Sequence, residues 1–424
     1  MSAAPRYRDG VAAGTNTDVV VHVHALAKGG EGVGRLADGR AVFVAGMLPG
    51  ETARVELTEF KARYARAALA ELLVVSPDRV VPPCAWHRAG CGGCDLMHLG
   101  PDAQHSAKVQ LAREALQRIG RLADPQVFAG SVLPSAALRT TVRVAVHHGR
   151  AAFRRRATHH LIEVGDCHVT HPALVELIAA GRFGSAREAT LRTSAASGER
   201  LVVLDYGDAA PRGRSRPALG PLLPDDVQVV DAADLRAGSS GLAVVPAIHE
   251  VVAGRRWQIS AGSFFQTSAV GAEALVAAVA AAAGAGRAHR VLDAYCGVGL
   301  LSAAFDADVS VVAVESSPFS VADAMVNLAD RDAEVVRARF ERCKPGTFDV
   351  AVADPARRGL GRDAAEVLAG TGAAVVVLVS CDLAALGRDS GDLTALGYDH
   401  AGSTVLDLFP HTSHAEVVTR FERR

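Results

Sequence analysis

The sequence predicts a multidomain protein with an N-terminal OB-like β-barrel, a central α+β domain and a C-terminal α/β domain. Residues 16–76 consist of short β-rich runs separated by glycine turns, which is typical of a small barrel. From residue 261 to residue 424, strand-like and helix-like segments alternate, which predicts a doubly wound parallel sheet. Residues 77–260 mix both patterns and contain four of the seven cysteines. A chain of 424 residues is long enough for several domains.

The C-terminal prediction depends on the order of its segments. Strand-like segments lie at 290–293, 309–315, 334–337, 349–354, 373–380, 402–408 and 414–420. Helix-like segments at 319–329 and 363–370 lie between strands, as a parallel sheet requires. No clear helix separates the last two strands, so an antiparallel hairpin is expected there. A parallel sheet that ends in such a hairpin is the Rossmann-like pattern of class I methyltransferases.

Charge and hydropathy limit the possible partners and location. The N-terminal residues lack the apolar core of a signal peptide, and the apolar stretch 269–285 contains Glu273, so a cytoplasmic protein without membrane contact is expected. The net charge is −1, which argues against a uniformly basic RNA-coating protein. Between Gln104 and His160, however, ten lysines and arginines stand against two acids. This local excess indicates contact with a polyanion. The helix-like segment 101–121 is expected to pack on the C-terminal domain.

A cofactor site is expected at the ends of the C-terminal strands. In Asp293-Ala-Tyr295-Cys-Gly297-Val-Gly299, a strand runs into a glycine turn that lets a ligand approach the backbone closely. Glu315 ends the second strand, where a carboxylate suits ribose hydroxyls, and Asp354 ends the fourth. We expect S-adenosyl-L-methionine rather than a dinucleotide, because no second mononucleotide-binding half is evident.

A nucleophile and a base are expected at the same edge of the sheet. Cys381 follows the run Val377–Ser380, and Glu416 lies in the last strand-like segment. A thiol, a carboxylate and a methyl donor at one edge suit methyl transfer to a pyrimidine carbon. C5 of uracil, for example, is too weak a nucleophile to attack a methyl sulfonium directly. A thiolate must therefore first add to C6, and a base must later remove the C5 proton. We expect the start of a helix near Asp382 to favour the Cys381 thiolate. Cys296 and Cys343 have no such partner and are expected to be packing residues.

Four cysteines in the central region have spacings that suit a metal site. Cys84, Cys91 and Cys94 lie close together, and Cys167 follows at a distance. Four thiolates can bind zinc or a [4Fe–4S] cluster, and the spacing alone leaves both open. The spacing typical of radical enzymes is absent, so a structural role is expected.

The chain resembles a known family over essentially its whole length. It is similar to the bacterial 23S rRNA (uracil-C5)-methyltransferases that carry a TRAM domain and an iron–sulfur cluster. The resemblance is carried by Gly29–Arg35 and Leu48–Glu51 in the barrel, Phe264-Phe265-Gln266, Ser380-Cys381-Asp382-Leu383 and Phe409–Glu416. Two residues depart from the usual motifs, since Ala356 and Leu383 stand where the family has proline.

The resemblance implies roles for individual residues. Cys381 would be the nucleophile and Glu416 the base, and Gln266, Tyr295, Glu315 and Asp354 would contact S-adenosyl-L-methionine. The four cysteines would hold a [4Fe–4S] cluster. The expected partner is RNA, most often 23S rRNA, and not DNA, with the protein acting as a monomer.

Three alternative functions remain to be compared. Methylation of tRNA at uridine 54 would use the same chemistry, although the bacterial tRNA enzyme generally lacks the TRAM-like and cysteine regions. A cytosine-C5 methyltransferase would typically have a second cysteine in the Asp354-Pro-Ala-Arg motif, where this chain has none. A non-catalytic RNA-binding or assembly factor would not need both Cys381 and Glu416.

Overall fold

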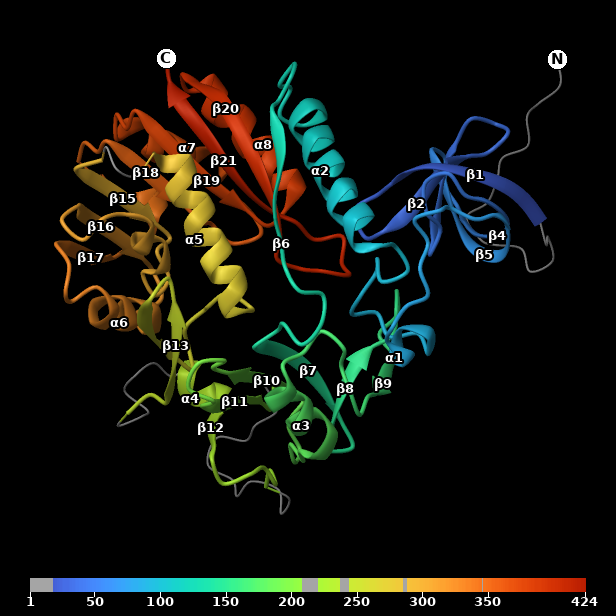
Figure 1. Ribbon diagram of the computed structural model, residues 1–424, viewed down its shortest axis with the longest axis horizontal. Helices are drawn as coiled ribbons and strands as arrows, with labels where there is room; N and C mark the ends of the chain where they lie inside the picture. The colour runs from blue at the N-terminus through green and yellow to red at the C-terminus, as the bar shows by residue number, and fades with distance from the viewer. Residues whose placement is uncertain (1–17, 208–219, 237–243, 285–287, 345) are drawn as a thin grey trace. The chain divides into compact units, whose positions relative to one another are not determined.

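The computed structural model describes residues 18–207, 220–236, 244–284, 288–344 and 346–424 (Figure 1). Its chain divides into two compact units. The smaller unit comprises Met1–Pro82, as far as it is described, together with Asp95–Ala107 and His411–Ser413. The larger unit comprises Pro83–Cys94, Lys108–Pro410 and His414–Arg424. The expected boundaries at residues 76 and 260 remain predictions.

The smaller unit contains the barrel that the sequence predicts. Its strands are β1 (Asp18–Leu26), β2 (Glu31–Arg35), β3 (Ala41–Ala45), β4 (Thr52–Phe60) and β5 (Tyr64–Val74), and they close in the order β1-β2-β3-β5-β4. Alternate residues point inward, so Val21, Val23, Val42, Val44 and Val55 are almost completely buried. Residues 16 and 17 of the expected barrel lie outside the described residues.

Two distant segments join the barrel within the smaller unit. His411 donates its N–H to the side-chain oxygen of Gln104 at 2.7 Å. Ser413 donates its N–H and its hydroxyl to the Asp95 carboxylate at 2.8 and 2.6 Å, and the N–H of Gly29 donates to the Ser413 hydroxyl. The middle of the Phe409–Glu416 motif is therefore held by side chains more than 300 residues earlier in the sequence.

In its described residues, the larger unit contains two sheets of more than two strands. The central sheet has the order β12-β11-β10-β7-β8-β9. Its strands are β7 (Thr141–His147), β8 (Arg150–Arg154), β9 (Leu161–Glu163), β10 (Glu188–Thr193), β11 (Arg200–Asp205) and β12 (Val227–Asp231). The helices α1 (Ala85–Arg88), α3 (Pro172–Ala180) and α4 (Ala232–Arg236) belong to the same region, and a hairpin of β13 (Ala247–Val252) and β14 (Arg255–Ser260) follows.

The second sheet confirms the expected methyltransferase architecture. Its order is β17-β16-β15-β18-β19-β21-β20-β6. The strands are β15 (Arg290–Ala294), β16 (Ser310–Glu315), β17 (Ala333–Arg337), β18 (Val350–Ala353), β19 (Val375–Ser380), β20 (Tyr398–Asp407) and β21 (Glu416–Arg423). β21 is antiparallel to both neighbours, as the missing helix predicts. β6 (Val127–Val132) pairs in parallel with β20, so a segment from the central part of the sequence completes this sheet.

Helices cover both faces of this sheet, because successive strand residues point to opposite sides. Val291 packs with α5 (Ala269–Ala283) and η3 (Leu300–Ala304), whereas Leu292 packs with α7 (Gly361–Gly370) and η4 (Phe340–Arg342). The remaining helices are α2 (Pro101–Arg118), α6 (Pro318–Asn327) and α8 (Leu383–Ala395). Figure 1 shows α5 lying along one face of the sheet. Among the described residues, no helix is long and apolar enough to cross a membrane.

Candidate active site

A pocket of about 720 Å³ lies at the carboxyl ends of the central parallel strands in the larger unit. The turn after β15, the end of β16, the segment after β18 and the residue after β19 all contribute to its wall. Parallel strands all end at the same edge of a sheet, and their loops therefore meet there. The sequence-predicted residues that line the pocket are Gln266, Tyr295, Gly297, Glu315, Asp354, Cys381 and Glu416.

Strand register brings the candidate nucleophile and base together. Ser380 at the end of β19 pairs with Val417 near the start of β21. Because the two strands are antiparallel, the next residue after Ser380, which is Cys381, lies opposite Glu416, the residue before Val417. Both side chains line the pocket, with Glu416 only 4% exposed. The structure thus places both residues on one cavity, and their roles remain predictions.

The electrostatics at Cys381 differ from the expectation of a favoured thiolate. Burial raises the pKa of Cys381 to about 11, and the negative charges of Glu416 and Asp354 add to this effect. The positive charge of Arg357 opposes it. Asp382 does cap α8, accepting the N–H groups of Ala384 and Ala385. Burial and the two carboxylates therefore favour the thiol, which is opposite to the direction expected for Cys381.

Two of the carboxyl groups in the pocket, Glu416 and Asp354, are also shifted toward their neutral forms. Burial and then the charge of Asp354 raise the pKa of Glu416 well above its ordinary value, while Arg357 acts in the opposite direction. Burial raises the pKa of Asp354 to about 7. Charges in a poorly solvated pocket repel one another strongly, so this site disfavours several negative charges at once.

The turn after β15, here called the cradle, has an unusual backbone conformation at the pocket wall. Tyr295, Gly297 and Gly299 have positive φ angles of 61°, 57° and 89°. A Cβ at Gly297 would have no neighbour within 4 Å, whereas one at Gly299 would contact Leu328 at 3.0 Å. Glycine is therefore needed at 299 for packing, and the turn is open at 297.

Glu315 organises this cradle through its carboxylate. It accepts the backbone N–H groups of Gly297 at 3.2 Å, Ser316 at 2.6 Å and Ser317 at 2.7 Å. The Tyr295 hydroxyl donates to Glu341 at 3.1 Å. The glycine turn and the end of β16 are thus linked through one carboxylate at the pocket wall.

Two of the expected cofactor residues lie outside the pocket lining. Asp293 is completely buried, and the hydroxyl of Ser302 donates to it at 2.8 Å. Gly299 begins the turn into η3 but is not part of the wall. Burial raises the pKa of Asp293 to about 7, and the charges of Asp354 and Glu315 act in the same direction. Both residues can support the cradle from beneath.

The four central cysteines approach one another but do not form a ligand set. Burial raises the pKa of Cys94 to about 12, and the negative charges of Cys167, Cys91 and Cys84 contribute, so the four thiols are electrostatic neighbours. All four are free and partly buried. Among the described residues, no three or more His, Cys, Asp or Glu side chains are placed so that they could hold a metal ion. The geometry as it stands therefore does not fit a bound metal or cluster.

Sequence reasoning missed several residues of the pocket wall. Arg357 was not singled out, although its charge acts on both Cys381 and Glu416. Its position three residues after Asp354 was the available signal. Glu341 and His414 also line the pocket, and Glu341 comes from η4, which has no motif to mark it.

Comparison with known proteins gives the family. A protein of Streptomyces avermitilis called an uncharacterized RNA methyltransferase is 33% identical over 427 residues, covering 95% of this chain and 97% of that protein. This chain belongs to that RNA methyltransferase family. The 23S rRNA (uracil(1939)-C(5))-methyltransferase RlmD of Methylococcus capsulatus is 30% identical to this RNA methyltransferase over 436 residues, covering 96% and 97% of the two chains.

Two further comparisons agree with its architecture. Residues 16–70 of the RNA methyltransferase match the TRAM domain family. A solved structure of the Pyrococcus abyssi tRNA (uracil-54, C5)-methyltransferase with S-adenosyl-L-homocysteine has a TM-score of 0.68 and 22% identity. The match covers 95% of this chain and 100% of the P. abyssi chain. This likeness shows a shared fold, and it extends over the barrel and both sheets.

The buried Asp293 gives a pH-dependent stability prediction. Its pKa is about 7 in the folded protein against an ordinary value of 3.8, so the folded state keeps a proton that the unfolded state loses. The contribution of protonated Asp293 to the free energy of unfolding is therefore fully present below about pH 4, and it is lost as the pH rises toward 7. Asp293→Asn stays neutral and keeps an acceptor for Ser302. The variant should gain roughly 1 kcal/mol or more relative to wild type between pH 4 and pH 8, or about 2–4 °C in melting temperature.

Differential scanning fluorimetry at both pH values measures this gain. Asp330→Asn is the control, because its exposed carboxylate pairs with Arg255, whose hydrogen bond lowers the pKa of Asp330. That variant should lose stability at pH 8 rather than gain it. An Asp293→Asn melting shift independent of pH would contradict the prediction.

Proposed function

We propose that this RNA methyltransferase transfers a methyl group from S-adenosyl-L-methionine to C5 of a uridine in RNA. The observation that carries the proposal is the meeting of Cys381 and Glu416 in one pocket with the Tyr295–Gly299 turn. A thiol and a carboxyl group facing one ring are the two groups that methylation at C5 requires. The similarity to the M. capsulatus enzyme supports the same chemistry.

The methyl donor would occupy the cradle after β15, and it would supply an electrophilic methyl group on a sulfonium. The residues present fit such a ligand, because the turn is open at Gly297 and Glu315 has a carboxylate at the wall. Glu315 is placed to accept from ribose hydroxyls, and Gln266 reaches the same cavity. Asp354 borders the part of the pocket nearest Cys381 and Glu416.

Cys381 and Glu416 act at different steps of the proposed reaction. The Cys381 thiolate forms a bond to C6 of the uracil, and the ring electrons pass toward C5 and O4. C5 then forms a bond to the methyl group, the electron pair of the broken sulfur–methyl bond stays on the donor sulfur, and C5 carries both a methyl group and a proton. Glu416 removes that proton, after which the bond from Cys381 to C6 breaks and the thiolate leaves.

The electrostatics of the pocket agree with this order. Cys381 ionises most easily while Glu416 is protonated, because the negative charge of Glu416 raises the pKa of Cys381. Addition moves the thiolate charge onto C5 and O4 of the ring, and methyl transfer from the sulfonium then neutralises it, so Glu416 can ionise at a lower cost. Arg357 favours both charged forms in turn.

Replacing either reacting residue should separate the two steps. Cys381→Ala should remove methylation, reducing the rate at least 1,000-fold, and should leave RNA binding within about twofold. Glu416→Gln should still allow addition and methyl transfer but block release, so a covalent protein–RNA adduct should accumulate. Methyl incorporation and denaturing gel electrophoresis measure the two outcomes. An active Cys381→Ala variant would reject the assigned nucleophile.

For the substrate, we propose 23S rRNA. The similarity to the M. capsulatus enzyme and the TRAM domain support it. Mass mapping of 5-methyluridine in rRNA and tRNA, from cells with and without the gene, should show one uridine of 23S rRNA losing its methyl group. Loss confined to tRNA would instead identify tRNA as the substrate. Unchanged 5-methyluridine in both RNAs would overturn the proposed activity.

We also propose a structural metal centre at Cys84, Cys91, Cys94 and Cys167, and a [4Fe–4S] cluster is the favoured form. The charge coupling among the thiols supports it, although the sulfur atoms would have to move to become a ligand set. No step of the reaction uses this centre.

Metal analysis tests this centre directly. Protein purified without oxygen should contain about four iron atoms and four sulfides per chain and absorb near 400 nm, and Cys167→Ser should lose both. Cys343→Ser is the matched control and should keep them. About one zinc per chain would identify zinc instead, and neither metal would reject the proposal.

A further inference from the structure

One wall of the pocket is a short segment that follows β14. Gly262, Phe264, Phe265, Gln266 and Thr267 all line the cavity. The segment is reached through the turn Ser260–Ser263. This turn lies between two buried charged residues, Arg192 and Asp323, and neither of these lines the pocket.

Asp323 binds the donor groups of the turn. It lies on α6 and is completely buried. One carboxylate oxygen accepts the Ser260 hydroxyl at 2.6 Å and the Gln258 amide at 2.9 Å. The other accepts the Ser260 N–H at 2.8 Å and the Ser263 hydroxyl at 2.5 Å. Four hydrogen bonds to one carboxylate offset much of the cost of burying it.

Arg192 binds the acceptor groups of the same turn. It lies on β10 of the central sheet and is 8% exposed. Its two terminal nitrogens donate to the carbonyl oxygens of Ser260 at 3.1 Å and Ser263 at 2.9 Å. Burial lowers the pKa of Arg192 to about 10 and the charge of Asp323 opposes this, so the guanidinium stays charged at neutral pH.

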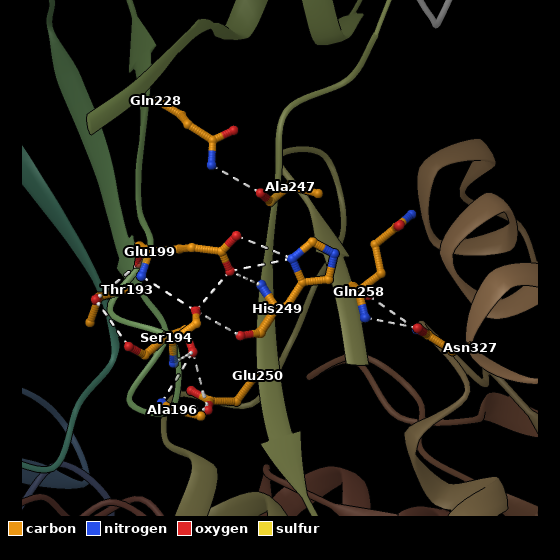
Figure 2. Close-up of polar contacts among 11 residues, drawn as sticks. Thr193, Ser194, Ala196, Glu199, Gln228, Ala247, His249, Glu250, Gln258 and Asn327 are labelled. Carbon is orange, nitrogen blue, oxygen red and sulfur yellow. Dashed lines mark hydrogen bonds and ion pairs between the residues drawn. The ribbon is translucent and has the colours of Figure 1, made fainter. Parts of the chain in front are cut away.

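The neighbouring contacts fix the two ends of this wall. Asn327 lies one turn after Asp323 on α6 and accepts the N–H of Gln258 at 2.8 Å, as Figure 2 shows. At the other end, Thr140 donates its N–H to the carbonyl oxygen of Thr267 at 2.7 Å. A Cβ on Gly262 would lie 2.4 Å from the Phe319 ring, so the turn has no room to shift toward α6.

The central sheet is itself fastened to the hairpin before this turn. Figure 2 shows Glu199 next to His249, whose N–H donates to the Glu199 carboxylate at 2.7 Å. Glu250, also on β13, accepts the N–H groups of Ala195 and Ala196. The strand that carries Arg192 is therefore connected to the same hairpin that leads into the wall.

We propose that Arg192 and Asp323 are positioning residues that hold the Gly262–Thr267 wall in the shape that binds the methyl donor. Arg192 binds the carbonyl oxygens of the turn and Asp323 binds its N–H and hydroxyl groups. Gln266 is therefore held in its binding position before the ligand arrives. Preorganisation of this kind acts on affinity, since the wall need not be ordered on binding. The identity of the ligand rests on the proposed function.

Asp323→Asn tests the clamp, because an amide replaces one acceptor oxygen and leaves Arg192 without a partner charge. The Kd for S-adenosyl-L-methionine, measured by calorimetry without RNA, should rise about tenfold, as expected for the loss of one or two hydrogen bonds. The KM for the donor should rise to a similar extent, while kcat at saturating donor stays within about twofold. Hydrogen exchange of residues 260–267 should become faster.

The matched control is Asp330→Asn. Asp330 pairs with Arg255, so this ion pair also joins β14 to the end of α6 without touching the turn. The Kd of the Asp330→Asn variant for S-adenosyl-L-methionine should stay within twofold of the wild-type value. An equal loss of affinity in both variants would mean general loosening and would overturn the proposal.

Two milder variants keep the test decisive if Asp323→Asn does not fold. Ser263→Ala removes one hydroxyl donor and should weaken donor binding about threefold. Arg192→Lys keeps the charge, but one ammonium cannot replace both guanidinium contacts, so an intermediate loss is expected. Folded variants with the wild-type Kd would overturn the clamp. A wild type that binds no S-adenosyl-L-methionine would overturn both this proposal and the proposed function, whereas one that binds it but methylates no uridine would overturn only the function.

Discussion

The constraint on which this site depends is the cost of gathering acidic groups in a poorly solvated pocket. Glu416 and Asp354 raise the pKa of Cys381, Asp354 raises that of Glu416, and the positive charge of Arg357 lowers both. The pocket therefore tolerates one new negative charge far better than two. In the proposed reaction this limit is respected, because addition to C6 moves the thiolate charge onto the ring and methyl transfer neutralises it before the carboxylate has to ionise. A mechanism that needed both anions together would work against this electrostatic balance.

The scaffold supplies the proximity that this chemistry needs. Parallel strands bring the ends of β15, β16, β18 and β19 to one edge, and the antiparallel strand β21 returns to that edge and begins at Glu416. Pairing of Ser380 with Val417 leaves Cys381 and Glu416 level with each other. A shift of one residue in this pairing would turn Glu416 to the other face of the sheet. The hydrophobic core on both faces resists such a shift, because neighbouring residues pack into different clusters.

The three regions recognised in the sequence are less independent in the structure. β6 comes from the central part of the sequence but pairs with β20 in the C-terminal sheet. Arg192 belongs to the central sheet, yet it holds a turn that leads into the pocket wall. His411 and Ser413 lie within the Phe409–Glu416 motif, and they form hydrogen bonds with Gln104 and Asp95. Each of these contacts joins residues more than sixty positions apart, and sequence periodicity carries no signal over such distances.

The sequence by itself determined the barrel, the doubly wound sheet with its terminal hairpin, and most of the pocket residues. Hydrophobic periodicity and turn residues are local properties that can be read from short segments. Residues at the carboxyl ends of parallel strands lie at one edge of the sheet, so their grouping could also be predicted. Only the tertiary structure decided the ionisation tendencies, because the pKa of Cys381 depends on burial and on charges from Glu416 and Asp354. It also placed Asp293 beneath the pocket rather than in its wall, and it left the four cysteines near one another without forming a ligand set. These outcomes depend on solvent exclusion and on distances between remote segments, which no stretch of sequence encodes alone.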